Sequence, residues 1–347
     1  MTETATTARR TAPGGSDRPL TEAYDTALLD LDGVVYAGPN AIEHAVASLE
    51  TARTAGMRLA YVTNNASRPP RVVAAHLTEL GVPAEPADVI NSAQAAARVV
   101  AEKVPAGSKV LVVGGLGLEE ALAERGLVAV RSLDEEPLAV VQGYDASVGW
   151  LHLAEASYAV QRGLPWVASN TDLTVPTARG IAPGNGTLVA AVRAATGVEP
   201  EVAGKPLPPM HRETVLRTGA KRPLVVGDRL DTDIEGAFNG GVDSLLVFTG
   251  VTTPAQLLSA PAEHRPTYLA EDLRGLLVAH AGVAALDGGA FGCGGWTAAV
   301  EDGELRLTGT GADRWDGLRA LCAAAWTALD AGGAPVDGRK ALAELGF

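Results

Sequence analysis

Strand-like apolar runs that alternate with helix-like segments limit the folds open to this chain. Residues 27–32, ALLDLD, and 57–65, MRLAYVTNN, read as strands, whereas 41–56 and 67–81 have the periodicity of helices. Ser67 is the expected N-cap of the second helix, because a serine hydroxyl accepts a hydrogen bond from a first-turn N–H group. Strands that alternate with helices form parallel sheets covered by helices, so the pattern predicts an α/β fold with a doubly wound, Rossmann-like sheet.

The same alternation returns in the middle of the chain, and the C-terminal part differs. Between about 92 and 200 the segments SKVLVVGG, EEALAERG, LAVVQGYD and PWVASN predict a second α/β unit. In GGLG, at 114–117, the glycines fit a turn between a strand and a helix better than a dinucleotide site, because the third glycine of that motif is missing. Residues 294–309 predict a β-hairpin with its Asp-Gly pair at a type I′ turn, and 313–333 predict a helix.

Composition and charge argue against several classes of protein. The polar residues 1–18 lack the apolar segment of a secretory signal and are expected to form a disordered tail. No run approaches about 18 apolar residues, which argues against a membrane span. The net charge of −13 argues against a nucleic-acid surface, which is usually basic. Cys293 and Cys322 lack the spacing of a metal site and fit two reduced thiols, so a cytoplasmic location is expected.

Aspartates cluster directly after two of the strand-like runs. Asp30 and Asp32 follow the first run, and a later run is followed by Asp228, Asp231 and Asp233. A single aspartate at such a place can simply cap the next turn. Because the carboxyl ends of parallel strands meet at one edge of a sheet, however, these side chains are expected to lie close together. Each pair about 4 Å apart would repel by roughly 4 kcal/mol at an effective dielectric near 20, and a hard divalent cation such as Mg²⁺ relieves that repulsion.

Two further motifs supply groups that suit a phosphate. Thr63, Asn64 and Asn65 follow the second strand and lead into a helix N-terminus, where anions bind well. Lys205 stands in the proline-stiffened loop AGKPLP and offers a point charge for a phosphate oxygen. Taken alone, Thr-Asn-Asn also fits a turn, and the lysine also fits an exposed surface. Because the chain is acidic overall, an anion would need positive charge placed locally by a metal or by such a lysine.

Taken in order, these motifs resemble those of the haloacid dehalogenase superfamily of phosphohydrolases. The matching segments are DLDGV at 30–34, TNN at 63–65, GKP at 204–206 and GDRLDTD at 227–233, and the resemblance covers about 20–275. The long stretch between TNN and GKP is similar to the branch with a large α/β cap. That branch includes para-nitrophenyl, phosphoglycolate, glycerol phosphate, pyridoxal phosphate and nucleotide phosphatases.

The resemblance implies a discontinuous core at 19–91 with 201–277, and an inserted cap at 92–200. Composition places the disordered tail at 1–18 and a linker rich in alanine and glycine near 278–293. The C-terminal extension is expected at 285–347. The α+β extension resembles the small acetyltransferase-like segment of actinobacterial members of this branch. It is expected to serve packing or oligomerisation, or to sense a ligand, and a homodimer could form through the cap or the extension. Trp296, Trp315 and Trp326 are expected to anchor a core or an interface.

Roles for the individual residues follow from the same resemblance. Asp30 would be the nucleophile that forms an aspartyl-phosphate, and Asp32 would protonate the leaving alcohol and then activate water. The Asp30 carboxylate, the Asp32 main-chain carbonyl and Asp228 would hold Mg²⁺, while Asp233 would fix Lys205 or a metal-bound water. The groups that bind the phosphoryl oxygens would be Thr63, Asn64, Asn65 and Lys205. A carboxylate that attacks a phosphate dianion meets like charge, which Mg²⁺ and the lysine must offset.

The segment 169–192 resembles the substrate-facing loop of the cap and the helix that follows it. Residues 184–186, Gly-Asn-Gly, indicate a close approach of backbones. Asn170 and Asp172 either face the cleft or make a turn, and Arg179 either contacts the substrate or lies on the surface. In the family that the chain resembles, specificity for pyridoxal phosphate usually goes with an aromatic or histidine clamp in this loop, and the segment holds none. The resemblance therefore implies a small phosphorylated metabolite as the substrate, with glycerol 3-phosphate first. The alternatives are phosphoglycolate, pyridoxal 5′-phosphate and nucleotide monophosphates, a phosphotransferase or mutase, and a non-catalytic metabolite-binding protein.

Overall fold

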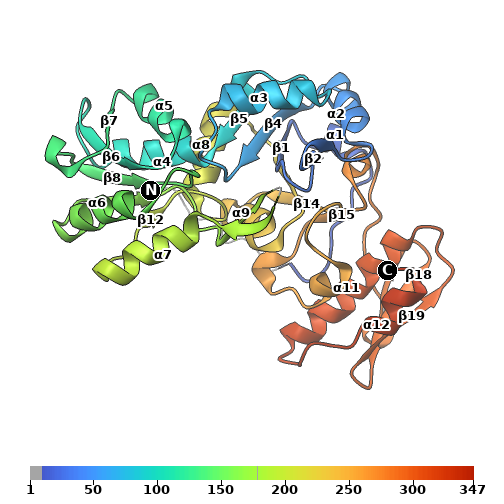
Figure 1. Ribbon diagram of the computed structural model, residues 1–347. Helices are drawn as coiled ribbons and strands as arrows, with labels where there is room; N and C mark the ends of the chain where they lie inside the picture. The colour runs from blue at the N-terminus through green and yellow to red at the C-terminus, as the bar shows by residue number, and fades with distance from the viewer. Residues whose placement is uncertain (1–9, 178) are drawn as a thin grey trace. The chain divides into compact units, whose positions relative to one another are not determined.

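The computed structural model describes residues 10–177 and 179–347, which divide into two units (Figure 1). The first unit comprises the chain up to Ala60 and from Ala220 to the C-terminus, and the second comprises Tyr61–Gly219. The predicted core of 19–91 with 201–277 and the predicted cap of 92–200 stay a prediction.

The first unit contains four neighbouring strands of a parallel sheet. They are hydrogen-bonded in the order β15-β14-β13-β1, which confirms the predicted parallel α/β fold. All four residues of β1 are buried, as expected of a strand covered on both faces. The bounds of the strands are Thr26–Leu29 for β1, Pro223–Gly227 for β13, Asp243–Val247 for β14 and Tyr268–Ala270 for β15. The other elements here are α1 (Leu20–Ala23), β2 (Tyr36–Ala37), β3 (Asn40–Ala41), α2 (Ala45–Thr54), η3 (Leu230–Ile234), α9 (Glu235–Gly240), α10 (Pro254–Leu258), η4 (Ala262–His264) and η5 (Leu273–Leu277).

The C-terminal part of the first unit is an antiparallel sheet with helices. Its elements are β16 (Ala284–Ala285), η6 (Asp287–Gly289), β17 (Phe291–Cys293), β18 (Trp296–Glu301), β19 (Glu304–Gly309), α11 (Arg314–Asp330) and α12 (Arg339–Glu344). Figure 1 shows α11 beside β18 and β19. The predicted hairpin is confirmed, since Asp302 and Gly303 both have positive φ, at 51° and 80°, as a type I′ turn requires.

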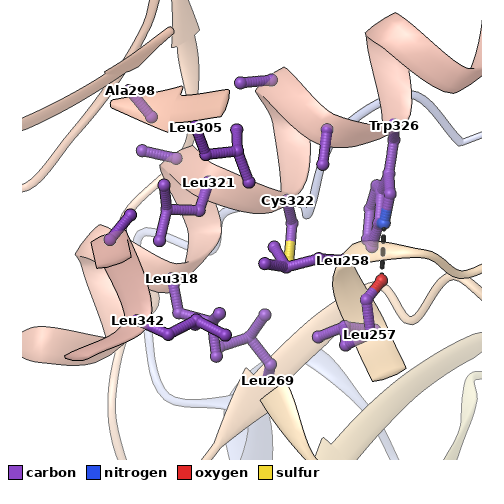
Figure 2. Packing of buried hydrophobic residues seen from close by; sticks show 14 of the residues in the cluster. Leu257, Leu258, Leu269, Ala298, Leu305, Leu318, Leu321, Cys322, Trp326 and Leu342 are labelled. Atoms are coloured by element: carbon purple, nitrogen blue, oxygen red, sulfur yellow. Dashed lines mark hydrogen bonds between the residues drawn. The ribbon is translucent and has the colours of Figure 1, made fainter. Parts of the chain in front are cut away.

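This extension shares one hydrophobic cluster with residues 234–269 of the first unit. Leu257, Leu258 and Leu269 pack against Leu318 and side chains further along α11 (Figure 2). The fully buried Trp326 indole N–H donates to the Leu257 carbonyl at 2.9 Å. Because the two segments exclude water together, the extension is a continuation of the first unit's core rather than a separately packed module.

A second parallel sheet forms the centre of the second unit. Its strands are ordered β12-β9-β8-β6-β7, with bounds Glu201–Val202 (β12), Trp166–Ala168 (β9), Ala139–Gln142 (β8), Lys109–Val113 (β6) and Val128–Val130 (β7). Gly114 and Gly115 connect β6 to the next helix, which confirms the predicted glycine turn. The other elements are β4 (Arg58–Thr63, entering from the first unit), α3 (Pro70–Glu79), η1 (Pro86–Asp88), β5 (Val89–Asn91), α4 (Ser92–Ala101), α5 (Leu116–Glu124), η2 (Leu133–Glu135), α6 (Trp150–Gln161), β10 (Thr174–Thr177), β11 (Gly180–Pro183), α7 (Asn185–Thr196) and α8 (Pro208–Thr218).

A buried carboxylate explains why α8 belongs to the second unit. Glu213 is 0% exposed and accepts hydrogen bonds from Arg98 of α4, from Arg125 at the end of α5 and from Arg217 of α8. Burial alone would raise the pKa of Glu213, but the hydrogen bonds and charges of the three guanidinium groups hold that pKa below its usual value. These ion pairs tie residues 208–218 to 92–125.

Helix α3 begins later than predicted. Its N-cap is Pro69 and its first residue is Pro70, not the residues after Ser67. A proline fits the first helical position because it lacks an N–H group that would have no intrahelical partner. The Ser67 backbone N–H and hydroxyl instead donate to the Asn65 side-chain oxygen, at 2.9 and 2.8 Å. The serine therefore stabilises the loop before the helix.

The predicted disordered tail is ordered over its second half. Residues 1–9 of that prediction lie outside the described residues. Gly14 N–H donates to the Thr267 carbonyl at 2.7 Å, and Ser16 exchanges two backbone hydrogen bonds with His280, at 2.8 and 2.9 Å. These hydrogen bonds pair backbone groups that the polar composition had suggested would be exposed to water. Within the described residues, no helix is long and apolar enough to cross a membrane.

Candidate active site

Two neighbouring strands of the first unit end at the acidic residues. Leu29 of β1 pairs with Val226 of β13, and the Asp30 N–H donates to the Val226 carbonyl at 2.8 Å. Asp30 and Asp228 are therefore the first residues after two adjacent parallel strands. Asp233 returns to the same place from the short helical turn η3. Carboxylate oxygens of Asp30, Asp228 and Asp233 all lie within 4.8 Å of one another.

The other predicted acids lie outside this cluster of three. Asp32 is exposed, two residues beyond Asp30, in the turn that leads to β2. Asp231 is also exposed, and its carboxylate pairs with the Arg229 guanidinium at 2.8 Å. The structure thus brings together three of the five aspartates that follow the two strands.

Glycines let the backbone approach the Asp228 carboxylate closely. Gly33 has a φ of 88°, and a Cβ at that position would lie 2.7 Å from Asp228 Oδ2. A Cβ at Gly250 would overlap the same carboxylate. The Val251 N–H donates to Asp228 Oδ2 at 2.7 Å, and the Arg229 N–H donates to Asp233 Oδ2 at 3.2 Å. Backbone groups thus fix both of these buried carboxylates.

The donor set of the cluster fits a hard divalent cation. Asp228 and Asp233 are 0% and 1% exposed, so water screens their charges poorly. At separations near 5 Å each pair of carboxylates repels by about 3 to 4 kcal/mol if the effective dielectric is near 20. Carboxylate oxygens are also the ligands that Mg²⁺ prefers in proteins. A bound cation would therefore stabilise this arrangement of side chains.

In the second unit, one asparagine joins two of the predicted motifs. The Asn64 side-chain oxygen accepts from the Lys205 N–H at 2.8 Å, and its amide nitrogen donates to the Lys205 carbonyl at 3.2 Å. Lys205 Nζ donates to the Val62 carbonyl at 3.2 Å. A Cβ at Gly204 would lie 2.6 Å from Asn64 Oδ1, which explains the glycine before the lysine. The motifs TNN and GKP, far apart in sequence, are thus in contact.

The remaining residues of the TNN motif stabilise the loop after β4. Thr63 Oγ1 accepts from the Asn65 N–H at 3.1 Å, and Asn65 Oδ1 accepts from Ser67. The Thr-Asn-Asn motif therefore does form a turn, as one of its two sequence interpretations expected. Thr63 and Asn64 are buried, whereas Asn65 is exposed.

Residues of the predicted substrate loop extend this network. The Asn170 side chain donates to the Asn64 carbonyl at 2.7 Å and accepts from the Asp172 N–H at 3.1 Å, so it makes a turn and also holds TNN. Asp172 Oδ1 accepts from the Asn64 amide at 3.3 Å. A Cβ at Gly184 or Gly186 would overlap backbone of residues 171–174, which confirms the predicted close approach. Arg179 is exposed.

The loop that follows β14 belongs to the site, although no sequence motif marked it. Besides Val251, this loop provides Thr249, whose hydroxyl donates to the Gly33 carbonyl at 2.6 Å, and Thr252, whose N–H donates to the Asp228 carbonyl at 3.2 Å. The sequence signal that could have indicated this loop is its position. The loop follows a third apolar run, so it lies at the same carboxyl edge of the sheet as the acidic residues.

Comparisons with known proteins agree with this architecture. Family models match in three places: haloacid dehalogenase-like hydrolase over 27–128, HAD-hydrolase-like over 202–276, and a GCN5-related N-acetyltransferase like domain over 293–347. The chain is 48% identical over 259 residues to D-glycerol 3-phosphate phosphatase of Mycobacterium tuberculosis, spanning 75% of this chain and 72% of that protein. It is 37% identical over 252 residues to acid sugar phosphatase of Staphylococcus aureus, spanning 72% of this chain and 95% of that protein.

A solved structure is similar over nearly the whole chain. It is the crystal structure of a glycerol phosphate phosphatase from Mycobacterium tuberculosis in complex with magnesium. The TM-score is 0.85 and the identity 41%, over 94% of this chain and 99% of that one. The chain therefore belongs to the haloacid dehalogenase-like hydrolases. Within that family it is a phosphatase, a hydrolase of phosphoric monoesters.

Proposed function

We propose that this phosphatase hydrolyses a small phosphomonoester, glycerol 3-phosphate first, with Mg²⁺ as cofactor and an aspartyl-phosphate on Asp30 as intermediate. The observation that carries the proposal is the convergence of the Asp30, Asp228 and Asp233 carboxylates within 4.8 Å at the ends of adjacent strands. Three anionic groups held this close, two of them buried, favour a bound cation. The similar glycerol phosphate phosphatase was crystallised with magnesium.

The proposed ligands of Mg²⁺ are the Asp30 and Asp228 carboxylates and the Asp32 main-chain carbonyl, with Asp233 supporting them. When bound, the ion would offset the repulsion between the Asp30 carboxylate and a phosphate dianion. Lys205 would add a second positive charge at the phosphoryl oxygens.

Hydrolysis would proceed in two displacements. An Asp30 carboxylate oxygen would attack phosphorus while the bond to the leaving oxygen breaks, and the protonated Asp32 would give its proton to that oxygen. Asp32, now a carboxylate, would then take a proton from water as the water oxygen attacks phosphorus. The bond from phosphorus to Asp30 would break, releasing phosphate and restoring both carboxyl groups.

In the second unit, Thr63, Asn65 and Lys205 would bind phosphoryl oxygens. Asn64 would act through Lys205, because both ends of its amide bond the lysine backbone. We therefore assign Asn64 to positioning in addition to the binding role that the family resemblance implies. Positioning of this kind lowers the barrier by removing freedom of motion before the reaction.

Similarity to relatives supports glycerol 3-phosphate as the first candidate substrate. The relative named D-glycerol 3-phosphate phosphatase is 48% identical over 259 residues, and a similar solved glycerol phosphate phosphatase covers 94% of this chain. A sugar phosphate is the second candidate, because acid sugar phosphatase is 37% identical.

A phosphate-release assay tests the proposal. The panel should hold glycerol 3-phosphate, sugar phosphates, phosphoglycolate, pyridoxal 5′-phosphate and nucleotide monophosphates, each with Mg²⁺ and with a chelator. We expect glycerol 3-phosphate to give the highest kcat/KM and the chelator to abolish release. Another ester ranking clearly higher would overturn the substrate, and undiminished release with the chelator would overturn the metal role.

A further inference from the structure

An aromatic pair connects the C-terminal extension to the loop beside the acidic cluster. The Trp315 ring, in the first turn of α11, stacks on Phe248 with ring centroids 5.1 Å apart and an interplanar angle of 27°. The C-terminal Phe347 packs on the same tryptophan, with centroids 5.0 Å apart. Phe248 is the first residue after β14, so the extension contacts the core where a strand ends at the site's edge of the sheet.

Directly after Phe248, the chain forms the wall of the acidic cluster. Backbone groups of Val251 and Thr252 bond the side chain and the carbonyl of Asp228, at 2.7 and 3.2 Å. Gly250 packs so close to that carboxylate that a Cβ would overlap it. Only two residues therefore separate the ring that Trp315 contacts from the N–H group that orients Asp228.

Polar contacts hold the first turns of α11 at this edge of the sheet. The buried Arg319 donates to the Leu269 carbonyl at 2.7 Å and to Asp316 at 2.6 Å. Arg314 donates to the Glu271 carboxylate at 3.0 Å, and the Glu271 carbonyl accepts from the Phe248 N–H at 3.1 Å. The helix and the loop are thus fastened to the same strand end, so the position of Trp315 is defined relative to the loop.

We infer that Trp315 is a positioning residue for the metal site, because its ring holds Phe248 and the loop 249–252 in the conformation that orients Asp228. This inference rests on the proposed function, since it takes Asp228 as a ligand of Mg²⁺. If Trp315 positions Asp228 in this way, the C-terminal extension contributes to the affinity for the cation. An extension that only adds buried surface would change the free energy of unfolding and leave cation affinity as it is.

The test measures Mg²⁺ binding to the full chain without substrate, by isothermal titration calorimetry. Removing a partner that orients a ligand typically weakens metal binding 10- to 100-fold. Because Trp315 acts on Asp228 only through Phe248 and the loop, we expect Trp315→Ala to raise the Kd by about 10-fold, the lower end of that range. Trp315→Phe keeps a ring on Phe248 and should stay within about twofold of wild type. Leu307→Ala is the matched control, because Leu307 packs on the same hydrophobic cluster from β19.

The outcomes separate the inference from the proposed function. If Trp315→Ala does not fold, Trp315→Leu and deletion of Phe347 provide milder losses of the same packing. A folded variant that binds Mg²⁺ as wild type does, or equal weakening in Leu307→Ala, overturns the role of Trp315. Failure of wild type to bind Mg²⁺, or unaltered binding by Asp228→Asn, overturns the proposed metal site itself. The inference and the proposed metal site are both supported if wild type binds Mg²⁺, Asp228→Asn loses that binding and Trp315→Ala weakens it.

Discussion

The Asn64 side-chain amide makes hydrogen bonds in both directions with the backbone of Lys205, 141 residues further along the chain. Its oxygen accepts at 2.8 Å and its nitrogen donates at 3.2 Å. Because one side chain satisfies both polar groups of the lysine backbone, it fixes the point from which the lysine side chain extends. The asparagine therefore controls where the charge of Lys205 lies.

Asn64→Ala should reduce kcat/KM by on the order of 100-fold, because a displacement of about 1 Å at a charged group can cost that much. Steady-state phosphate release measures it. Asn239→Ala removes an exposed amide on α9 and should change kcat/KM less than twofold. Equal activity of Asn64→Ala and wild type would show that Lys205 does not depend on this amide.

Asp30→Asn should lower phosphatase turnover by on the order of 1,000-fold or more while the fold remains intact, because an amide is a far weaker nucleophile than a carboxylate. The matched control is Asp231→Asn, which alters an exposed carboxylate of the GDRLDTD motif that pairs with Arg229. Turnover and the circular dichroism spectrum should be measured for both variants. Near-normal turnover of Asp30→Asn would refute the assignment of the nucleophile.

Much of the fold could be predicted from local sequence pattern. The apolar runs before Asp30 and Asp228 were recognisable as strands, because strands covered by helices on both faces of a sheet leave a nearly continuous hydrophobic signal. All residues of β1 are buried, and those of β13 are buried or half-buried. The Asp302-Gly303 turn was predictable because positive φ favours those residues. The start of α3 was not predictable, because the sequence alone allows Ser67 to be the N-cap. In the structure Ser67 hydrogen-bonds Asn65 instead, and the helix begins at Pro70.

The site was predictable where side chains carry the chemistry, and hidden where the backbone does. Asp30, Asp228 and Lys205 are recognisable from residue type and motif order. Val251 orients Asp228 through its backbone N–H group. Every residue except proline has this group, so no residue type marks the position in the sequence. The stacking of Trp315 on Phe248 joins distant segments, and a single sequence carries no signal for such a pairing.

Gly250→Ala should weaken Mg²⁺ binding and lower the free energy of unfolding by about 1 to 3 kcal/mol, the usual cost of overpacking a close contact. The added Cβ would overlap the Asp228 carboxylate and push it away from Asp30. Calorimetric titration and urea unfolding measure the two effects. Gly149→Ala is the control, since its Cβ would meet nothing within 4 Å. Unchanged values in both measurements would contradict the close packing at Asp228.

Glu213→Gln should destabilise the protein at neutral pH by about 1 to 3 kcal/mol, because it removes the buried carboxylate that Arg98, Arg125 and Arg217 share. The three guanidinium groups are partly exposed, and Arg217 keeps Glu124 as a second partner. The exposed Glu79→Gln should change the free energy of unfolding by less than about 0.5 kcal/mol. Urea unfolding at pH 7 measures both variants.

The effect of Glu213 should depend on pH in one direction. Its pKa is lower in the folded than in the unfolded protein, so its contribution is complete above the unfolded value of about 4.3. That contribution is lost as the pH falls through the folded pKa, because the carboxyl group is then protonated in both states. The difference in unfolding free energy between wild type and Glu213→Gln should therefore be constant from pH 7 to about 5 and shrink toward pH 3. A difference that grows on acidification would mean that the three arginines do not stabilise the ionised carboxylate.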